Sequence, residues 1–235
     1  MKRLSIIFVG LLLSAGIGAQ TLEEIAKKNF DASKMGAYEK VQTITVNMKA
    51  YQSGMEMPMT IQMKKPDKVR ITVSFQGMEI VQAFDGTKGF MVNPMTGSNE
   101  AIEMPPSDAA KIKEQGKFTS PIMDYLKEGR LEMAGDATVS GKPAWKIKAT
   151  LPSGDVNYLY IDKSSFLQVK QDATVSQGGV DMTVETYMTD YTDFGGIFFP
   201  KTITSYANGA ELMVMMIEKV EIDKPLEDSL FTLKK

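Results

Sequence analysis

The sequence predicts a mainly β fold with short helices, in which a single curled antiparallel sheet forms an unclosed β-barrel. Two observations lead to this prediction. From residue 41 onward, apolar and polar residues alternate along most of the chain, which is typical of strands that are buried on one face. Turn-forming pairs such as Asn208-Gly209 separate the later strands at intervals of about ten residues. Strands joined by such short turns pair antiparallel, so we expect a meander.

The start of the chain has the pattern of a secretory signal peptide. Two basic residues precede an apolar run over residues 4–13, and small residues follow as far as Ala19. The apolar run is shorter than the roughly 20 residues that a membrane-spanning helix requires. We therefore predict a signal peptide over residues 1–19 that is cleaved after Ala19, or alternatively after Gly18. The rest of the chain is expected in the periplasm.

The composition excludes several kinds of site. The 235 residues include no Cys and no His, so a Ser-His-Asp triad, a Cys nucleophile, a haem ligand and an ordinary zinc site are excluded. Without Cys, the chain also lacks the residue that is lipidated in bacterial lipoproteins. A formal net charge of -2 argues against nucleic acid as a partner. We expect no catalytic residue, no cofactor and no metal.

A helix is expected directly after the signal peptide. Thr21 is a suitable N-cap, and Glu23 and Glu24 place negative charge in the first turn, where the helix dipole favours it. Gly36 is expected to end the helix. The apolar stripe of this helix consists of Leu22, Ile25, Ala26 and Phe30.

The strands are expected in two groups, separated by a two-helix insertion. Ser107 caps the first inserted helix, which ends near Gly116, and Ser120-Pro121 opens the second, which ends at Gly129. The first group of strands covers residues 43–50, 57–64, 69–75, 78–84 and 88–92. The second group covers residues 131–139, 143–151, 155–162, 165–174, 180–192, 197–207 and 210–222.

The number of strands has a consequence for the core. A sheet of this size cannot remain flat, because each strand is rotated relative to its neighbour. One face of the curled sheet is apolar and must be covered, but the sequence offers only three short helices for this purpose. We therefore predict an incompletely filled concavity, with the two-helix insertion as its lid or plug.

The high methionine content is consistent with such a concavity. The chain has 18 Met, including a group at Met55, Met57, Met59 and Met63 and a second group at Met213, Met215 and Met216. Met fills irregular gaps in ordinary cores, which is one interpretation of these groups. It is also frequent on adaptable apolar binding surfaces, where its unbranched side chain repacks around different ligands. Such a surface suits acyl chains.

A list of expected cavity residues follows if the more apolar face of each strand is concave. Phe198-Phe199-Pro200 is expected to rim the cavity or to cap its edge. The apolar residues expected to contact a ligand are Ile44, Val46, Met48, Met57, Met59, Ile61, Met63, Ile71, Val73, Phe75, Ile122, Met123 and Leu126.

One stretch of sequence goes beyond composition and periodicity. Lys64-Lys65-Pro66-Asp67-Lys68-Val69-Arg70 is followed by Asp85-Gly86-Thr87-Lys88-Gly89-Phe90 and then by Asn93-Pro94. With the signal peptide, the N-terminal helix and the strand order, these motifs resemble the LolA-like family of outer-membrane lipoprotein carriers and lipoprotein-sorting proteins, of the LolA/LolB/LppX-type superfamily. The segments 195–200 and 228–231 resemble a longer branch of that superfamily.

The resemblance implies a fold and a function. The family fold is an unclosed β-barrel with a helical lid over an apolar cavity, which would make residues 20–235 a single half-barrel domain. The implied function is a periplasmic carrier that binds lipid or lipoprotein acyl chains and delivers them toward the outer membrane without catalysis. Inner-membrane releasing proteins and outer-membrane accepting proteins are the implied partners, and the chain is expected to be a monomer.

The sequence departs from the family pattern at the motif proline. In the characterised carriers, the residue before this proline is Arg, which helps to hold the lid closed, whereas this chain has Lys65. Lys offers a point charge, while Arg offers a planar fork of donors. Lys65 is retained as a candidate lid contact, and a solvated turn lysine is the alternative. Arg70 lies off the apolar face and is not expected to replace it.

Three other functions remain open at this stage. A sensor or regulator of the cell envelope could use the same scaffold to bind lipidated or misfolded proteins. An enzyme would need a pair of carboxylates, for which Asp162 and Asp190 are candidates, although both are expected to be solvated turn residues. A structural or adhesive β-protein would have a filled core.

Overall fold

A computed structural model describes residues 20–177 and 180–233 of the chain. The predicted signal peptide, residues 1–19, and the predicted turn at Gly178-Gly179 lie outside the described residues. Among the described helices, none is both long and apolar enough to cross a bilayer.

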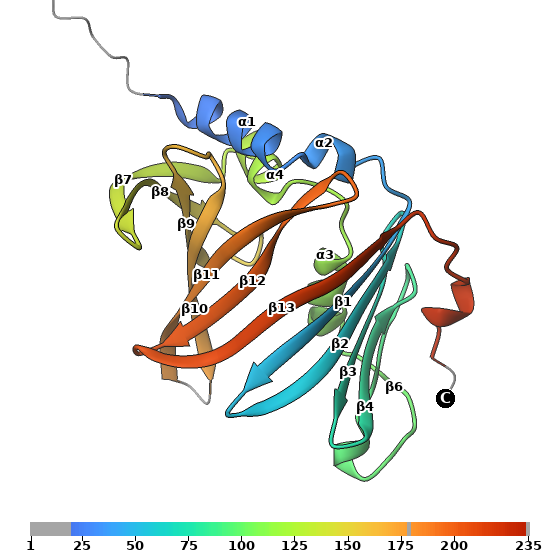
Figure 1. Cartoon of the computed structure of the whole chain (residues 1–235). Helices are drawn as coiled ribbons and strands as arrows, with labels where there is room; N and C mark the ends of the chain where they lie inside the picture. The colour runs from blue at the N-terminus through green and yellow to red at the C-terminus, as the bar shows by residue number, and fades with distance from the viewer. Residues whose placement is uncertain (1–19, 178–179, 234–235) are drawn as a thin grey trace, which may run out of the picture.

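One continuous antiparallel sheet contains all 13 described strands, in the spatial order β6-β5-β4-β3-β2-β1-β13-β12-β11-β10-β9-β8-β7 (Figure 1). The two groups of strands meet where β1 pairs with β13, and β6 and β7 remain as the free edges. The sheet curls without closing, as predicted. Its strands are β1 Thr43–Gln52, β2 Met55–Lys64, β3 Lys68–Phe75, β4 Met78–Phe84, β5 Gly89–Val92, β6 Ile102–Glu103, β7 Leu131–Val139, β8 Lys142–Thr150, β9 Val156–Asp162, β10 Gln168–Gln177, β11 Val180–Phe194, β12 Ile197–Ala207 and β13 Ala210–Ile222.

The N-terminal helix α1 (Leu22–Ala32) begins where the sequence predicts. Thr21 and Glu24 form a capping box, in which the Thr21 hydroxyl accepts the Glu24 N–H and the Glu24 carboxylate accepts the Thr21 N–H. The predicted end at Gly36 is wrong. The helix stops at Ala32 because Lys34 adopts a left-handed conformation (φ 52°), and a separate short helix α2 (Met35–Tyr38) follows.

The insertion contains helices α3 (Pro106–Gln115) and α4 (Pro121–Lys127). Ser120 and Pro121 open α4 as predicted. Ser107 is not the N-cap of α3, because the helix already begins at Pro106. Helix α3 packs tightly on β5 at Gly89, where an added Cβ would lie 2.7 Å from the Cβ of Ala109.

The strand register places the expected cavity residues of β1–β3 on one face of the sheet. Residues that are directly opposite each other in antiparallel strands point to the same side. Met48 lies opposite Met59 and Ile217, and Met59 lies opposite Val73. This face is concave and carries all four helices (Figure 1).

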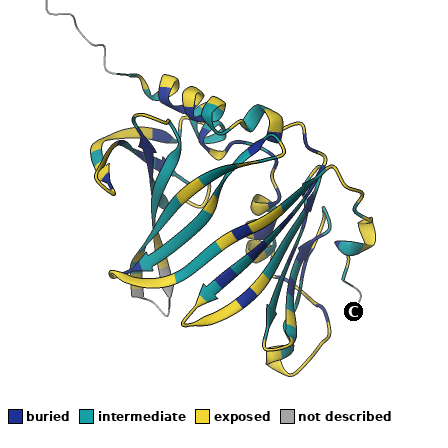
Figure 2. Ribbon diagram, viewed as in Figure 1, coloured by how far each residue is buried: buried dark blue, intermediate teal, exposed yellow. Residues whose placement is uncertain are grey.

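Two separate hydrophobic clusters lie on the concave face. The first joins β1–β4, β12 and β13 to α2 and α3, and the second joins β7–β9 to α1 and α4. Between them, β10 and β11 contain no buried residue among those whose side chains are described (Figure 2). β12 and β13 contribute only Ile197, Ala207 and Ile217 to the buried set. The middle of the sheet is therefore incompletely covered.

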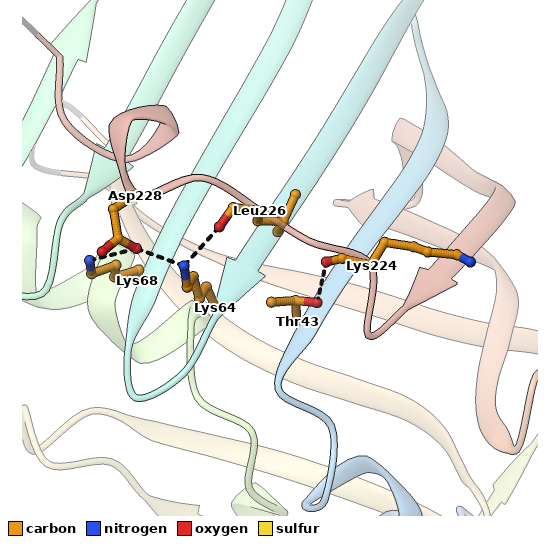
Figure 3. Close-up of polar contacts among 6 residues, drawn as sticks. All are labelled: Thr43, Lys64, Lys68, Lys224, Leu226 and Asp228. Atoms are coloured by element: carbon orange, nitrogen blue, oxygen red, sulfur yellow. Dashed lines mark hydrogen bonds and ion pairs between the residues drawn. The ribbon is translucent and has the colours of Figure 1, made fainter.

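The C-terminal segment crosses the convex face of β1–β3 as a strap, residues 223–233 (Figure 3). Lys64 donates to the Leu226 carbonyl at 2.7 Å and pairs with Asp228 at 2.8 Å. Lys68 pairs with the same carboxylate at 3.1 Å. Phe231 is fully buried at the end of the strap, which therefore contributes to the core from the outer side.

Candidate functional site

A cavity of about 390 Å³ lies between the helices and the middle strands of the sheet. We call it the covered cavity. Helices α1, α2 and α4 bound it on one side, and β8–β12 bound it on the other. Its lining consists of Asn29, Ser33, Met35, Ser120, Pro121, Ile122, Tyr125, Ala149, Asn157, Leu159, Gln168, Gln171, Met188, Tyr191, Phe198, Phe199 and Pro200.

Several polar groups of this lining bind other protein atoms. The Asn29 amide donates to the Phe166 carbonyl at 2.7 Å, and the Tyr191 hydroxyl donates to the Gln168 carbonyl at 2.8 Å. Burial raises the pKa of Tyr191 well above its ordinary value, so this hydroxyl stays neutral. With these groups paired, the cavity presents mainly apolar side chains. Such a lining favours a hydrocarbon ligand over a polar one.

A second cavity of about 500 Å³ adjoins the covered cavity. We call it the middle cavity. The two share Met35, Pro121, Tyr125 and Phe199 as common wall residues. Tyr38 also lines the middle cavity, and burial raises its pKa to about 12 while its hydroxyl donates to the Lys117 carbonyl at 3.2 Å. The wall between the cavities is therefore built from side chains of α2, α4 and β12.

A third pocket of about 510 Å³ adjoins the middle cavity and is more polar. We call it the lysine pocket. It shares Lys117, Thr119 and Asp124 with the middle cavity. Its complete lining is Glu39, Lys65, Pro66, Lys117, Phe118, Thr119, Asp124 and Lys127. Each cavity thus shares wall residues with the next, from the polar lysine pocket through the middle cavity to the apolar covered cavity.

Of the expected ligand contacts, only Ile122 lines the covered cavity. Met57 is buried, Phe75 is half-buried, and Met123 and Leu126 pack in the cluster of α1 and α4. The remaining residues pack in the cluster beneath α3, where several of the methionines fill the core. These remaining residues are Ile44, Val46, Met48, Met59, Ile61, Met63, Ile71 and Val73. Their contact with a ligand stays a prediction.

Most of the cavity residues on β9–β11 were not among the ligand contacts predicted from the sequence. Leu159, Gln171 and Met188 line the cavity, but polar residues interrupt the apolar alternation of β10 and weaken its signal. The segment Phe198-Phe199-Pro200 was expected at the rim, and all three residues line the cavity.

Lys65 contacts two parts of the helical layer. Its ammonium donates to the Glu39 carbonyl at the end of α2, at 2.5 Å, and lies 5.6 Å from the centre of the Phe118 ring. The predicted role of Lys65 as a contact to the two-helix lid stays a prediction. Arg70 points to the convex face, where it donates to the Leu230 carbonyl of the strap at 2.9 Å.

The carboxylates considered for catalysis do not form a pair. Asp162 is buried, and its oxygen accepts the N–H groups of Ser164 and Ser165 and the Ser165 hydroxyl, which fixes a turn. Asp190 accepts the hydroxyl of its neighbour Thr189. Among the described residues, no three acidic side chains gather in a way that could hold a metal ion.

The fold and the cavity together define a class: an open, curled β-sheet whose concave face holds an apolar cavity beneath short helices. Solved structures share this fold. A LolA superfamily protein from Nitrosomonas europaea aligns with a TM-score of 0.57 at 12% identity, over 91% of this chain and 98% of the other. The resemblance to the LolA-like fold is thus confirmed.

Two further structures support the same fold. A DUF1329 family protein from Desulfovibrio piger has a TM-score of 0.58 at 11% identity, over 88% of this chain and 97% of the other. A domain described as an outer membrane lipoprotein-sorting protein, from Vibrio parahaemolyticus, has a TM-score of 0.57 at 10% identity, over 88% and 97% of the two chains. No family model matches the sequence, and no curated protein matches it either.

Proposed function

We propose that this chain is a periplasmic carrier that binds the acyl chains of a lipid or lipoprotein and delivers them toward the outer membrane without catalysis. The observation that supports this proposal most strongly is the covered cavity, an apolar space on the concave face of the sheet. The fold that the chain shares with a LolA superfamily protein and a lipoprotein-sorting domain is consistent with it.

The physical need for such a carrier follows from the hydrophobic effect. Each acyl CH₂ group that leaves water contributes about 0.8 kcal/mol, so a multi-acyl anchor does not cross an aqueous compartment unshielded. A cavity of about 390 Å³ lies within the size range of ligand sites in proteins. The adjoining middle cavity offers further space for a long chain.

The helices over the cavity are fastened to the sheet by exposed polar contacts. Lys34, between α1 and α2, forms an ion pair with Asp193 at the end of β11, at a distance of 2.5 Å. Lys65 binds the Glu39 carbonyl at the other end of α2. Exposed contacts of this kind contribute little free energy. Most of the hold on α2 therefore comes from its buried Tyr38, which packs against Phe118 and Phe199.

The proposal is tested by what the protein carries. The chain is exported with its own leader, purified without detergent, and extracted with organic solvent for mass spectrometry. Co-purified acyl lipid or acylated peptide is the expected result. A clean extract, combined with no binding of fluorescently labelled fatty acids, contradicts the proposal.

A matched pair of variants locates the site. Met188 lines the covered cavity, whereas Met216 lies on the opposite face of the sheet and is 37% exposed. Met188→Gln is expected to weaken fatty-acid binding about tenfold, because a polar amide replaces apolar contact with the chain. Met216→Gln is expected to leave binding unchanged. Equal effects of the two substitutions argue against this cavity as the site.

A further inference from the structure

We infer that the lysine pocket is a site for the anionic, phosphate-type head group of the acylated ligand. This inference rests on the proposed function, because it places the acyl chains in the adjoining cavities. It adds that the carrier distinguishes ligands by head-group charge.

The cations of the pocket come from separate parts of the chain. Lys65 lies in the β2–β3 turn, Lys117 in the α3–α4 loop, and Lys127 at the end of α4. The Lys65 ammonium uses one donor for the Glu39 carbonyl, so two of its three donors remain for a ligand. Within the part of the chain that the structure describes, Lys127 forms no ion pair.

Two of the three pocket lysines, Lys65 and Lys127, remain available to an anion. Lys117 pairs with Glu114 at 2.8 Å, and that hydrogen bond raises the pKa of Lys117. The lining itself holds three lysines against Glu39 and Asp124. With Glu114 counted, the charges of the pocket balance, so binding of an anion would depend on direct hydrogen bonds from the ammonium groups of Lys65 and Lys127.

The pocket is coupled to the apolar interior through its walls. Phe118 forms part of the pocket and stacks on Tyr38 at a centroid distance of 5.4 Å. Tyr38 in turn contacts Phe199 edge-on at 5.5 Å, and Phe199 lines both the middle and the covered cavity. A ligand with a phosphate at the lysines can therefore extend its apolar part along this aromatic wall. This arrangement matches an amphiphile better than an isolated anion.

The test compares two lipids that differ only in the head group. Fluorescently labelled phosphatidylglycerol and diacylglycerol with identical acyl chains are titrated with the full mature chain at low salt. The wild type is expected to bind phosphatidylglycerol about tenfold more tightly. The Lys127→Gln variant is expected to lose most of this preference and to keep its diacylglycerol affinity within about twofold. An unchanged preference in this variant, or no preference in the wild type, overturns the inference.

Two controls complete the test. Lys142→Gln removes the same charge from an exposed strand position outside the pocket and should keep the preference. Inorganic phosphate at about 10 mM, compared with sodium chloride of equal ionic strength, should not abolish the preference. If phosphate alone binds the pocket while the wild type shows no preference between the two lipids, the pocket takes the free anion and the head-group assignment is overturned. If the wild type binds neither lipid, the proposed function itself fails.

Discussion

At the level of single residues, the methionines have two different structural roles. Met48 and Met63 are buried among apolar neighbours beneath α3, while Met35 and Met188 line the covered cavity. The sequence predicted an excess of Met on one face, because alternation fixes which side of a strand each residue occupies. It did not predict which Met would meet empty space, because that depends on where the helices lie.

The difference between the two groups is testable by truncation. Met63→Ala is expected to lower the free energy of unfolding by about 2–4 kcal/mol, because a buried side chain is lost and a cavity is left. Met188→Ala is expected to cost less than about 1.5 kcal/mol, since Met188 already borders a cavity. Urea unfolding followed by Trp145 fluorescence measures both. Equal losses contradict the assignment of the two roles.

The strap provides a prediction with a defined pH dependence. Hydrogen bonds from Lys64 and then Lys68 hold the pKa of Asp228 below its usual range. A carboxyl with a lower pKa in the folded state adds stability above its unfolded pKa, about 3.9, and loses it as pH falls through the folded value. The wild type should therefore melt at a higher temperature than Asp228→Asn by a constant amount from about pH 7 to pH 5. This difference should shrink as the pH falls below about 4.

Asp181→Asn serves as the control for this pH dependence. Asp181 is an exposed residue on β11. Its substitution should give a melting-temperature difference that varies less with pH than that of Asp228→Asn. If wild type and Asp228→Asn melt at the same temperature at neutral pH, the role assigned to Lys64 and Lys68 is contradicted.

At the level of elements, the positions of strands were easier to predict than the ends of helices. All expected strands are present, because alternating residues report directly on burial. The end of α1 was misplaced because Gly36 is a general helix terminator, whereas Lys34 adopts the left-handed conformation instead. The start of α3 was misplaced because consecutive prolines already fix the first helical turn.

The close contact between α3 and β5 depends on the absence of a Cβ atom at Gly89. Gly89→Ala is expected to lower the free energy of unfolding by about 1–3 kcal/mol, because the new Cβ would lie 2.7 Å from the Cβ of Ala109. Gly89→Ala combined with Ala109→Gly should recover part of this loss when measured by urea unfolding. The absence of any loss in the single variant shows that α3 does not depend on this contact.

At the level of the whole molecule, stability is unevenly distributed. The two hydrophobic clusters lie at either side of the sheet, and the strands between them bury little. The sequence predicted that three short helices would leave part of the sheet uncovered. It did not predict which strands would be the uncovered ones. That position depends on how α1 and α4 pack over β7–β9, which is a long-range property.

This distribution predicts a pattern of amide exchange. Backbone amides of β10 and β11 are expected to exchange faster than those of β8 and β9, because local opening is easier where few apolar side chains are buried. Bound lipid should slow exchange in β10 and β11 by filling the space beside them. Hydrogen–deuterium exchange by mass spectrometry measures both effects. Uniform exchange along the sheet contradicts this distribution.

The pairing of β1 with β13 also determines when the molecule can assemble. Ile44 lies opposite Ile222, so the join between the two halves of the sheet needs residues from nearly opposite ends of the chain. Contacts between residues so distant in sequence form late and slow folding. The β1–β6 half therefore cannot pair with the β7–β13 half until synthesis is almost complete. A chain truncated before β13 would leave two long unpaired strand edges, which is a condition that promotes aggregation.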